Sequence, residues 1–193
     1  MAFPREYLAY LVTEMATRLE KSGKVSIVGK ETVAGKIQQV IRENLAQEEH
    51  LNQEVRDYLE KYSEQMRRDG ISYQDMFKLV RKELLKKYRI IPWGGSEREG
   101  GLLSRDKVVE LSHQIVKELA ALKPDVEFKG ANNDVRLEII HQLQELMREE
   151  GQIEQAVRNK IRSQKREIAE GSAEWDILFR KYYTEEMRKL GAV

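Results

Sequence analysis

The segment Pro92-Trp93-Gly94-Gly95-Ser96-Glu97-Arg98-Glu99-Gly100-Gly101 combines proline, glycine and mixed charge, and it shows no apolar period. Proline and glycine are the strongest local interruptions of regular structure. On both sides of the segment, apolar residues recur at intervals of three and four, which is typical of amphipathic helices. The sequence therefore predicts a linker over residues 92–101 between two helical modules, 1–91 and 102–193.

The two modules repeat one order of elements. Each begins with an amphipathic helix that carries Leu8, Leu11 and Met15 in the first and Val108, Leu111 and Ile115 in the second. A short extended segment follows, around residues 25–28 and 125–128, and then three more helices, near 32–45, 51–66 and 72–88 and near 132–147, 153–168 and 172–190. Ser72 and Ser172 are predicted to cap the last helix of each module. The sequence predicts an all-α protein of two similar four-helix modules that arose by internal duplication.

The two extended segments are predicted to pair with each other. Each is too short to be stable alone, and each lies at the same position in its module. Their pairing would relate the modules by a pseudo-twofold axis.

Composition excludes several classes of function. The 193 residues include 34 Lys and Arg against 33 Asp and Glu, so the net charge is +1 and any polyanion would have to bind a local patch. There is no cysteine, which excludes disulfides, thiolate metal ligands and cysteine nucleophiles. The N-terminus reaches charge at Arg5, and no apolar run has the length of a membrane span. We therefore expect a cytoplasmic protein without a membrane partner.

Two Glu-x-x-His pairs, Glu110 with His113 and Glu138 with His141, have the spacing that supplies ligands in helical di-iron bundles. On a helical wheel each pair lies roughly 140–160° from the apolar face of its helix. The dinuclear site needs its ligands in the core, so we expect both pairs to face solvent and predict no metal site.

Catalytic signatures are absent from the sequence. No serine lies in a Gly-x-Ser-x-Gly elbow, and no glycine-rich loop ends in Gly-Lys-Ser or Gly-Lys-Thr. The adjacent carboxylates Glu149-Glu150 and Glu185-Glu186 diverge on a helix instead of sharing a site. We predict no catalytic residue, no cofactor and no enzymatic activity.

A basic stripe is the sharper signal. No acid occurs in residues 158–166, and four basic residues there fall within roughly 100° of helical arc: Arg158, Arg162, Lys165 and Arg166. Such a stripe can follow phosphates, and Tyr183 could stack on a base. A second basic stretch has only Glu83 against it and comprises Lys78, Arg81, Lys82, Lys86, Lys87 and Arg89.

A solvated face is the competing interpretation of the stripe. Three acids follow closely and could neutralise it: Glu167, Glu170 and Glu174. Trp175 and Tyr182 recur at helical spacing, which favours core packing over base stacking.

The C-terminal residues resemble a known family. Lys160-Ile161-Arg162-Ser163-Gln164-Lys165-Arg166, Glu170-Gly171-Ser172-Ala173-Glu174-Trp175-Asp176, Arg180-Lys181-Tyr182-Tyr183 and Glu185-Glu186, with the opening Leu103-Ser104-Arg105-Asp106-Lys107-Val108, are similar to the bacterial family catalogued as domain of unknown function 507. The resemblance is close over 103–191 and loose over 3–91. It implies a small, helical, bacterial and cytoplasmic protein without an assigned activity.

These observations favour a non-catalytic helical module that binds another protein or an assembly. We expect an exposed apolar groove between the modules, with Trp93 as an inter-module contact. The alternative is a nucleic-acid binder, for RNA or single strands, that uses Arg158, Arg162, Lys165, Arg166 and Tyr183.

Overall fold

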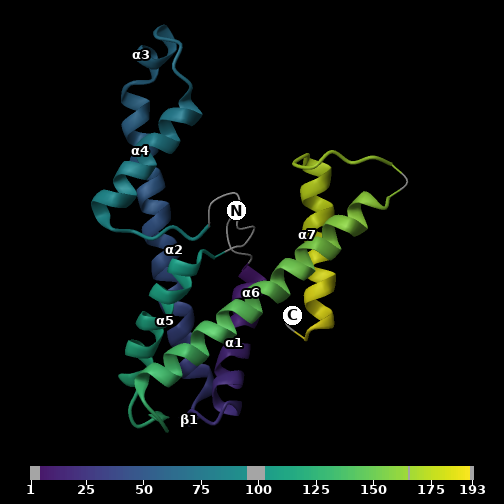
Figure 1. The fold of residues 1–193 in the computed structure, drawn as a ribbon. Coiled ribbons are helices and arrows are strands. Elements are labelled where there is room, and N and C mark those ends of the chain that lie inside the picture. Colours follow the sequence, from purple (N-terminus) through teal and green to yellow (C-terminus); the bar gives the residue numbers. More distant parts are fainter. Residues whose placement is uncertain (1–4, 95–102, 165, 192–193) are drawn as a thin grey trace. The chain divides into compact units, whose positions relative to one another are not determined.

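The computed structural model describes residues 5–94, 103–164 and 166–191, and these residues are 76% helical (Figure 1). In the described part of the chain the elements are α1 Arg5–Lys21, β1 Val25–Ile27, α2 Lys30–Lys61, α3 Ser63–Arg68, α4 Tyr73–Tyr88, α5 Arg105–Ala120, β2 Val126–Phe128, α6 Asn132–Arg162 and α7 Ala173–Lys189. The all-α prediction is confirmed. The described helices include none that has both the length and the apolar character needed to cross a bilayer.

Two expected helix boundaries do not occur. α2 continues through residues 46–50, and α6 continues through Gly151, so each is one long helix where the sequence predicts two. Residues 46–50 are mostly strong helix formers. Gly151 costs a helix only about 1 kcal/mol, and the buried face of α6 resumes beyond it at Val157 and Ile161.

The predicted pairing of the extended segments is confirmed. β1 and β2 form a two-stranded antiparallel sheet in which Val25 pairs with Phe128, Ser26 with Glu127 and Ile27 with Val126. The flanking amide of Val28 donates to the Asp125 carbonyl at 2.9 Å. The pairing follows because two three-residue strands satisfy their backbone groups only on each other.

The chain forms two compact units, which are described separately. Unit 1 comprises residues 1–38 and 112–193, and unit 2 comprises residues 39–111. These units do not follow the predicted sequence boundaries at 92–101, because α1 packs on α6, a helix of the other sequence half. Internal duplication stays a prediction.

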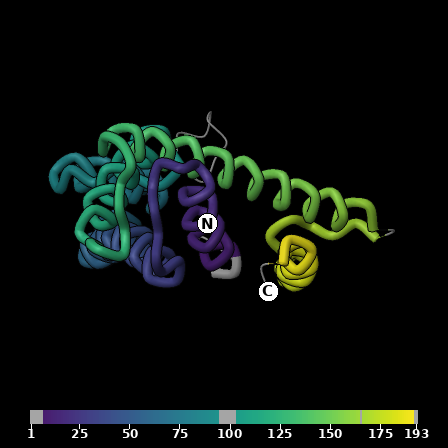
Figure 2. Tube along the Cα trace, turned by 90° about the horizontal axis from the view of Figure 1, so that it is seen from below, coloured from purple at the N-terminus to yellow at the C-terminus, as the bar shows by residue number. Residues whose placement is uncertain are grey.

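Unit 1 is built on α6. α1 packs against it, and α7 lies beside its C-terminal half, as Figure 2 shows with α7 seen nearly end-on. The buried side chains of this packing include Leu11, Met15 and Leu19 of α1, Ile139, Leu143 and Leu146 of α6, and Met187 of α7.

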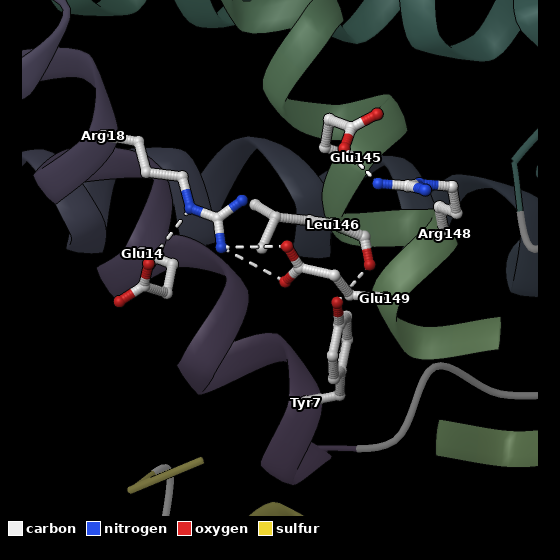
Figure 3. A network of polar contacts seen from close by, with 7 residues as sticks. All are labelled: Tyr7, Glu14, Arg18, Glu145, Leu146, Arg148 and Glu149. Atoms are coloured by element: carbon white, nitrogen blue, oxygen red, sulfur yellow. Dashed lines mark hydrogen bonds and ion pairs between the residues drawn. The ribbon is translucent and has the colours of Figure 1, made fainter. Parts of the chain in front are cut away.

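Polar contacts also join α1 to α6 (Figure 3). Arg18 donates from Nη2 to both carboxylate oxygens of Glu149 at 3.1 Å and from Nε to Glu14 at 3.1 Å. The Tyr7 hydroxyl donates to the Leu146 carbonyl. Charge-assisted hydrogen bonds of this kind are stronger than neutral ones, so Arg18 and Tyr7 add polar contacts to the apolar packing of α1 on α6.

Unit 2 contains a helical hairpin. The C-terminal half of α2 and α4 run side by side, with α3 near the turn between them (Figure 1). The core of the hairpin is a cluster of four buried side chains: Leu51, Val55, Leu59 and Met66. The apolar residues of α4 and of the segment just after it pack against this cluster and are themselves partly buried: Met76, Phe77, Val80, Leu84, Leu85 and Ile90. No residue of α4 is fully buried, so the described residues of unit 2 cover its apolar stripe only in part.

Candidate interaction surface

The C-terminal basic stripe is neutralised within the protein. Arg158 pairs with Glu154 at 2.7 Å and with Glu170, which also accepts from Arg162 at 3.1 Å. Arg166 pairs with Glu174 at 2.6 Å. Lys165 lies outside the described residues. All three described residues of the stripe therefore pair with acids, as the solvated-face interpretation predicts. The acids include Glu170 and Glu174, two of the three that were expected to neutralise the stripe.

The aromatic residues beside this stripe are also engaged. Tyr183 is 4% exposed, so its ring offers no free face to a base, and this burial disfavours the predicted stacking role. Trp175 is buried, as core packing predicts. Tyr182 is half-buried, and the Lys160 ammonium lies 4.1 Å from its ring centroid.

Glu150 is a buried carboxyl group on α6. The Tyr183 hydroxyl of α7 donates to its Oε1 at 3.3 Å. Burial, with the charge of Glu154 one turn on, raises the pKa of Glu150 to about 7. The same burial raises the pKa of Tyr183, and that of Tyr7 on α1, above the usual range for tyrosine. At neutral pH this cluster therefore holds a carboxyl group poised between its two protonation states.

The first residues of the predicted linker are fixed in place. The Trp93 amide donates to Glu48 at 2.8 Å, and the Trp93 carbonyl accepts from the Ser104 amide at 2.8 Å. Lys107 is buried, and its ammonium group donates to Asn44 Oδ1 and to Glu110 Oε2 at 2.8 Å each. The same ammonium group lies 5.7 Å from the centroid of the Trp93 ring. Trp93 thus contacts residues of both sequence halves and is itself only 7% exposed. The predicted groove stays a prediction.

The Glu-x-x-His pairs do not converge on a site. Glu110 is bound to Lys107, Glu138 is bound to Lys24 at 2.7 Å, and both histidines are exposed. Within residues 5–94, 103–164 and 166–191, no three potential ligands are grouped to hold a metal ion.

Exposed apolar side chains gather in sequence on the hairpin of unit 2. We call this set the hairpin surface: Tyr58, Tyr62, Ile71, Tyr73, Leu79 and Tyr88, each exposed to between 43% and 56%. The rings of Tyr58 and Tyr62 lie 5.1 Å apart. Six of the large apolar residues that are exposed in the described part of the chain thus lie between residues 58 and 88.

The outward face of α4 is basic. Lys78, Lys82 and Lys86, which we call the lysine row, recur every fourth residue and span roughly 80° of arc. Leu79 follows the row at roughly 100° from Lys78. Among the described residues, only Lys86 of the row has an ion-pair partner, Glu83 at 3.2 Å.

Arg81 differs from its basic neighbours on α4. It turns toward α2, where it donates to Asn52 at 2.9 Å and pairs with Glu48. Sequence reasoning grouped it with the lysines because only the three-dimensional contacts separate them.

Sequence reasoning missed Lys107 and Glu150, although a signal existed. Lys107 precedes the buried Leu111 and Ile115 by four and eight residues, and Glu150 follows Leu146 by four. A charged residue in the apolar row of a helix is expected to be buried and partnered.

A protein family matches the chain over nearly its whole length. A family model described as a protein of unknown function (DUF507) matches residues 1–192. The match therefore extends over the first sequence half, where the resemblance is loose, as well as the second. No curated protein matches the chain.

Proposed function

Because the chain belongs to this family of unknown function over nearly its whole length, we propose a function from its surface alone: a non-catalytic helical protein that binds another protein through the α2–α4 hairpin. The family description carries no activity to transfer. The proposal depends on the exposure and charge of residues 51–90.

The incomplete burial of α4 carries the proposal. A helix of 16 residues with apolar positions at Met76, Phe77, Val80 and Leu84 ordinarily buries that stripe fully, yet here each remains partly exposed. Covering apolar surface yields about 25 cal/mol per Å². A protein that packed on the hairpin would gain this free energy by supplying the missing layer.

Nucleic-acid binding is the second candidate. The residues predicted for it are mostly paired or buried, since Arg158, Arg162 and Arg166 contact acids and Tyr183 is enclosed. The lysine row is a basic surface that remains open to phosphates. It favours a polyanion of some kind, so nucleic acid is kept as one outcome of the test.

Photocrosslinking from the hairpin tests the proposed function. We would replace Leu79 with p-benzoylphenylalanine and irradiate cells that make the protein naturally. The matched control carries the same group at Ile177 of α7, which is 68% exposed. We expect a discrete adduct from position 79 that protease digests and nuclease leaves intact, and none from position 177.

Two other results would decide against this function. A nuclease-sensitive adduct would favour the nucleic-acid alternative. The absence of any adduct from positions 58, 73 and 79 would show that the hairpin surface binds no macromolecule.

A further inference from the structure

We propose that the segment bound along α4 is an acidic amphipathic helix, with carboxylates opposite the lysine row and apolar side chains over Leu79. This inference rests on the proposed function, because it names the kind of partner that the hairpin takes.

Charge on α4 selects an acidic partner. Asp75 in the first turn and Glu83 are the only acids of the helix. Lys78 and Lys82 are exposed and have no ion-pair partner in the described part of the chain. Carboxylates placed against these two lysines would form new ion pairs, and such charge complementarity gives specificity and faster association.

The spacing of the row selects a helical partner. Residues four apart on a helix lie about 6 Å apart along its axis. A partner helix with glutamates at every fourth position repeats the same distance, so successive carboxylates can oppose successive lysines. Lysine stems are long and flexible, which lets the ammonium groups follow small differences in crossing angle.

The apolar residues beside the lysine row favour an amphipathic helix over a nucleic acid as the partner. Leu79, 56% exposed, lies next to the row, and the partly buried Met76 follows it at roughly 160° from Lys78. Aliphatic side chains gain from apolar cover, which a phosphate backbone does not provide. An amphipathic helix supplies carboxylates and apolar cover from adjoining faces.

The same charge excludes a second copy of α4 as the occupant. Two α4 helices packed antiparallel along their rows would bring Lys82 against Lys82 and Lys78 against Lys86. Lysines placed directly opposite one another repel, which destabilises the contact. A self-association through this face is therefore disfavoured.

The test uses the full-length protein and a synthetic peptide of about 20 residues, long enough to cover the roughly 24 Å of α4. The peptide carries glutamate at every fourth position on one face and leucine on the adjoining face. Its binding is measured by fluorescence anisotropy against two probes: a scrambled peptide of the same composition and a 20-nucleotide poly(U). We expect the amphipathic peptide to bind at least about tenfold more tightly than either probe.

Charge reversal locates the contact. In the variant Lys78→Glu/Lys82→Glu/Lys86→Glu we expect the affinity for the peptide to fall by about tenfold or more. The matched control is Lys117→Glu/Lys123→Glu/Lys129→Glu, three exposed lysines of unit 1 that also have no ion-pair partner among the described residues. Its affinity should stay within about twofold of the original protein. Far-UV circular dichroism checks that both variants are folded. If the triple variant is not folded, the single variant Lys82→Glu replaces it, and we expect its affinity for the peptide to fall by about threefold.

Three results would overturn the inference. They are equal binding of the scrambled peptide, tighter binding of poly(U), and an affinity that survives reversal of the row. If position 79 gives a protein adduct while the peptide does not bind, the proposed function stands and the acidic-helix partner is wrong.

Discussion

Two charged side chains, Lys107 and Glu150, occupy the apolar rows of their helices, and their surroundings differ. Lys107 is enclosed by an amide oxygen and a carboxylate, each 2.8 Å from its ammonium group. Glu150 accepts one tyrosine hydroxyl and has no ion pair within the described part of the chain, and the negative charge of Glu154 acts on it. Burial of a charge is tolerated when it is partnered, so the two residues should respond to substitution in opposite ways.

The substitution Glu150→Gln tests the buried carboxyl. The folded protein raises the pKa of Glu150 from 4.5 to about 7, which means that it favours the protonated form. The stabilisation is therefore complete below about pH 4.5 and is lost as pH rises through about 7. Between pH 5 and pH 8 the free energy of unfolding of the original protein should fall, relative to that of the Gln variant, by about 1–2 kcal/mol.

Urea denaturation of both proteins at pH 5, 6, 7 and 8 measures this difference. Glu154, Tyr183 and Tyr7 are the ionisable groups that face Glu150 from α6, α7 and α1. Glu127→Gln, at an exposed position of β2, is the control and should follow the original protein. A constant difference between the Glu150 variant and the original protein at all four pH values would show that Glu150 does not titrate in this range.

The substitution Lys107→Met should destabilise the protein. Methionine keeps much of the packing of the stem, but it leaves the buried Asn44 Oδ1 without the Lys107 donor. Loss of a buried hydrogen-bond partner costs about 1–3 kcal/mol. Urea unfolding measures the cost, and Lys117→Met, at an exposed position of the same helix, should change stability by less than about 0.5 kcal/mol. Equal effects of the two substitutions would contradict the structural role of Lys107.

At the scale of single elements, two glycines at or near helix α6 and helix α7 have different backbone conformations. Gly151 lies inside α6 with no positive φ and open space around its Cα, whereas Gly171 has φ +83° just before α7. Gly151→Ala should therefore stabilise by about 0.5–1 kcal/mol, and Gly171→Ala should destabilise by about 1 kcal/mol. Thermal melts of the two variants measure the signs. A loss of stability in Gly151→Ala would mean that α6 is broken at this position in solution.

Local chemistry made the ends of helices predictable. Ser72 and Ser172 accept the amides of Asp75 and Trp175 at 3.4 Å and 3.1 Å, as the capping pattern predicts. The continuation of α6 through Gly151 was not predictable in the same way, because a single glycine weakens a helix less than burial of the flanking turns strengthens it. The continuation of α2 was missed because residues 46–50 carry no apolar period, although most of them are strong helix formers.

Long-range partners were the least predictable part of the candidate surface. The basic stripe was visible in the sequence, but its pairing with Glu170 and Glu174 depends on how the chain after α6 returns. The contrast with the open lysine row of α4 therefore appears only in three dimensions. Charge runs predict where cations are, and the fold decides which of them remain available.

At the scale of the whole chain, unit 1 joins the beginning of the sequence to its end. β1 pairs with β2, the Tyr7 hydroxyl bonds to the Leu146 carbonyl, and Arg18 holds Glu149. Both partners of each contact lie in unit 1, although they come from different sequence halves. A cut at residues 92–101 would separate all of these pairs.

We therefore expect neither sequence half to fold cooperatively alone. Fragment 102–193 lacks α1, whose buried Leu11, Met15 and Leu19 cover α6 in the intact chain, and its strand β2 lacks a partner. Circular dichroism melts of fragments 1–101 and 102–193 should show broad, weak transitions, because exposed apolar faces and a single short strand do not support a cooperative core. An equimolar mixture should recover a cooperative transition, since every lost contact can reform between the fragments, and its midpoint should rise with concentration. A sharp transition of fragment 102–193 alone would instead establish it as an independent domain and would restore the sequential division into two modules.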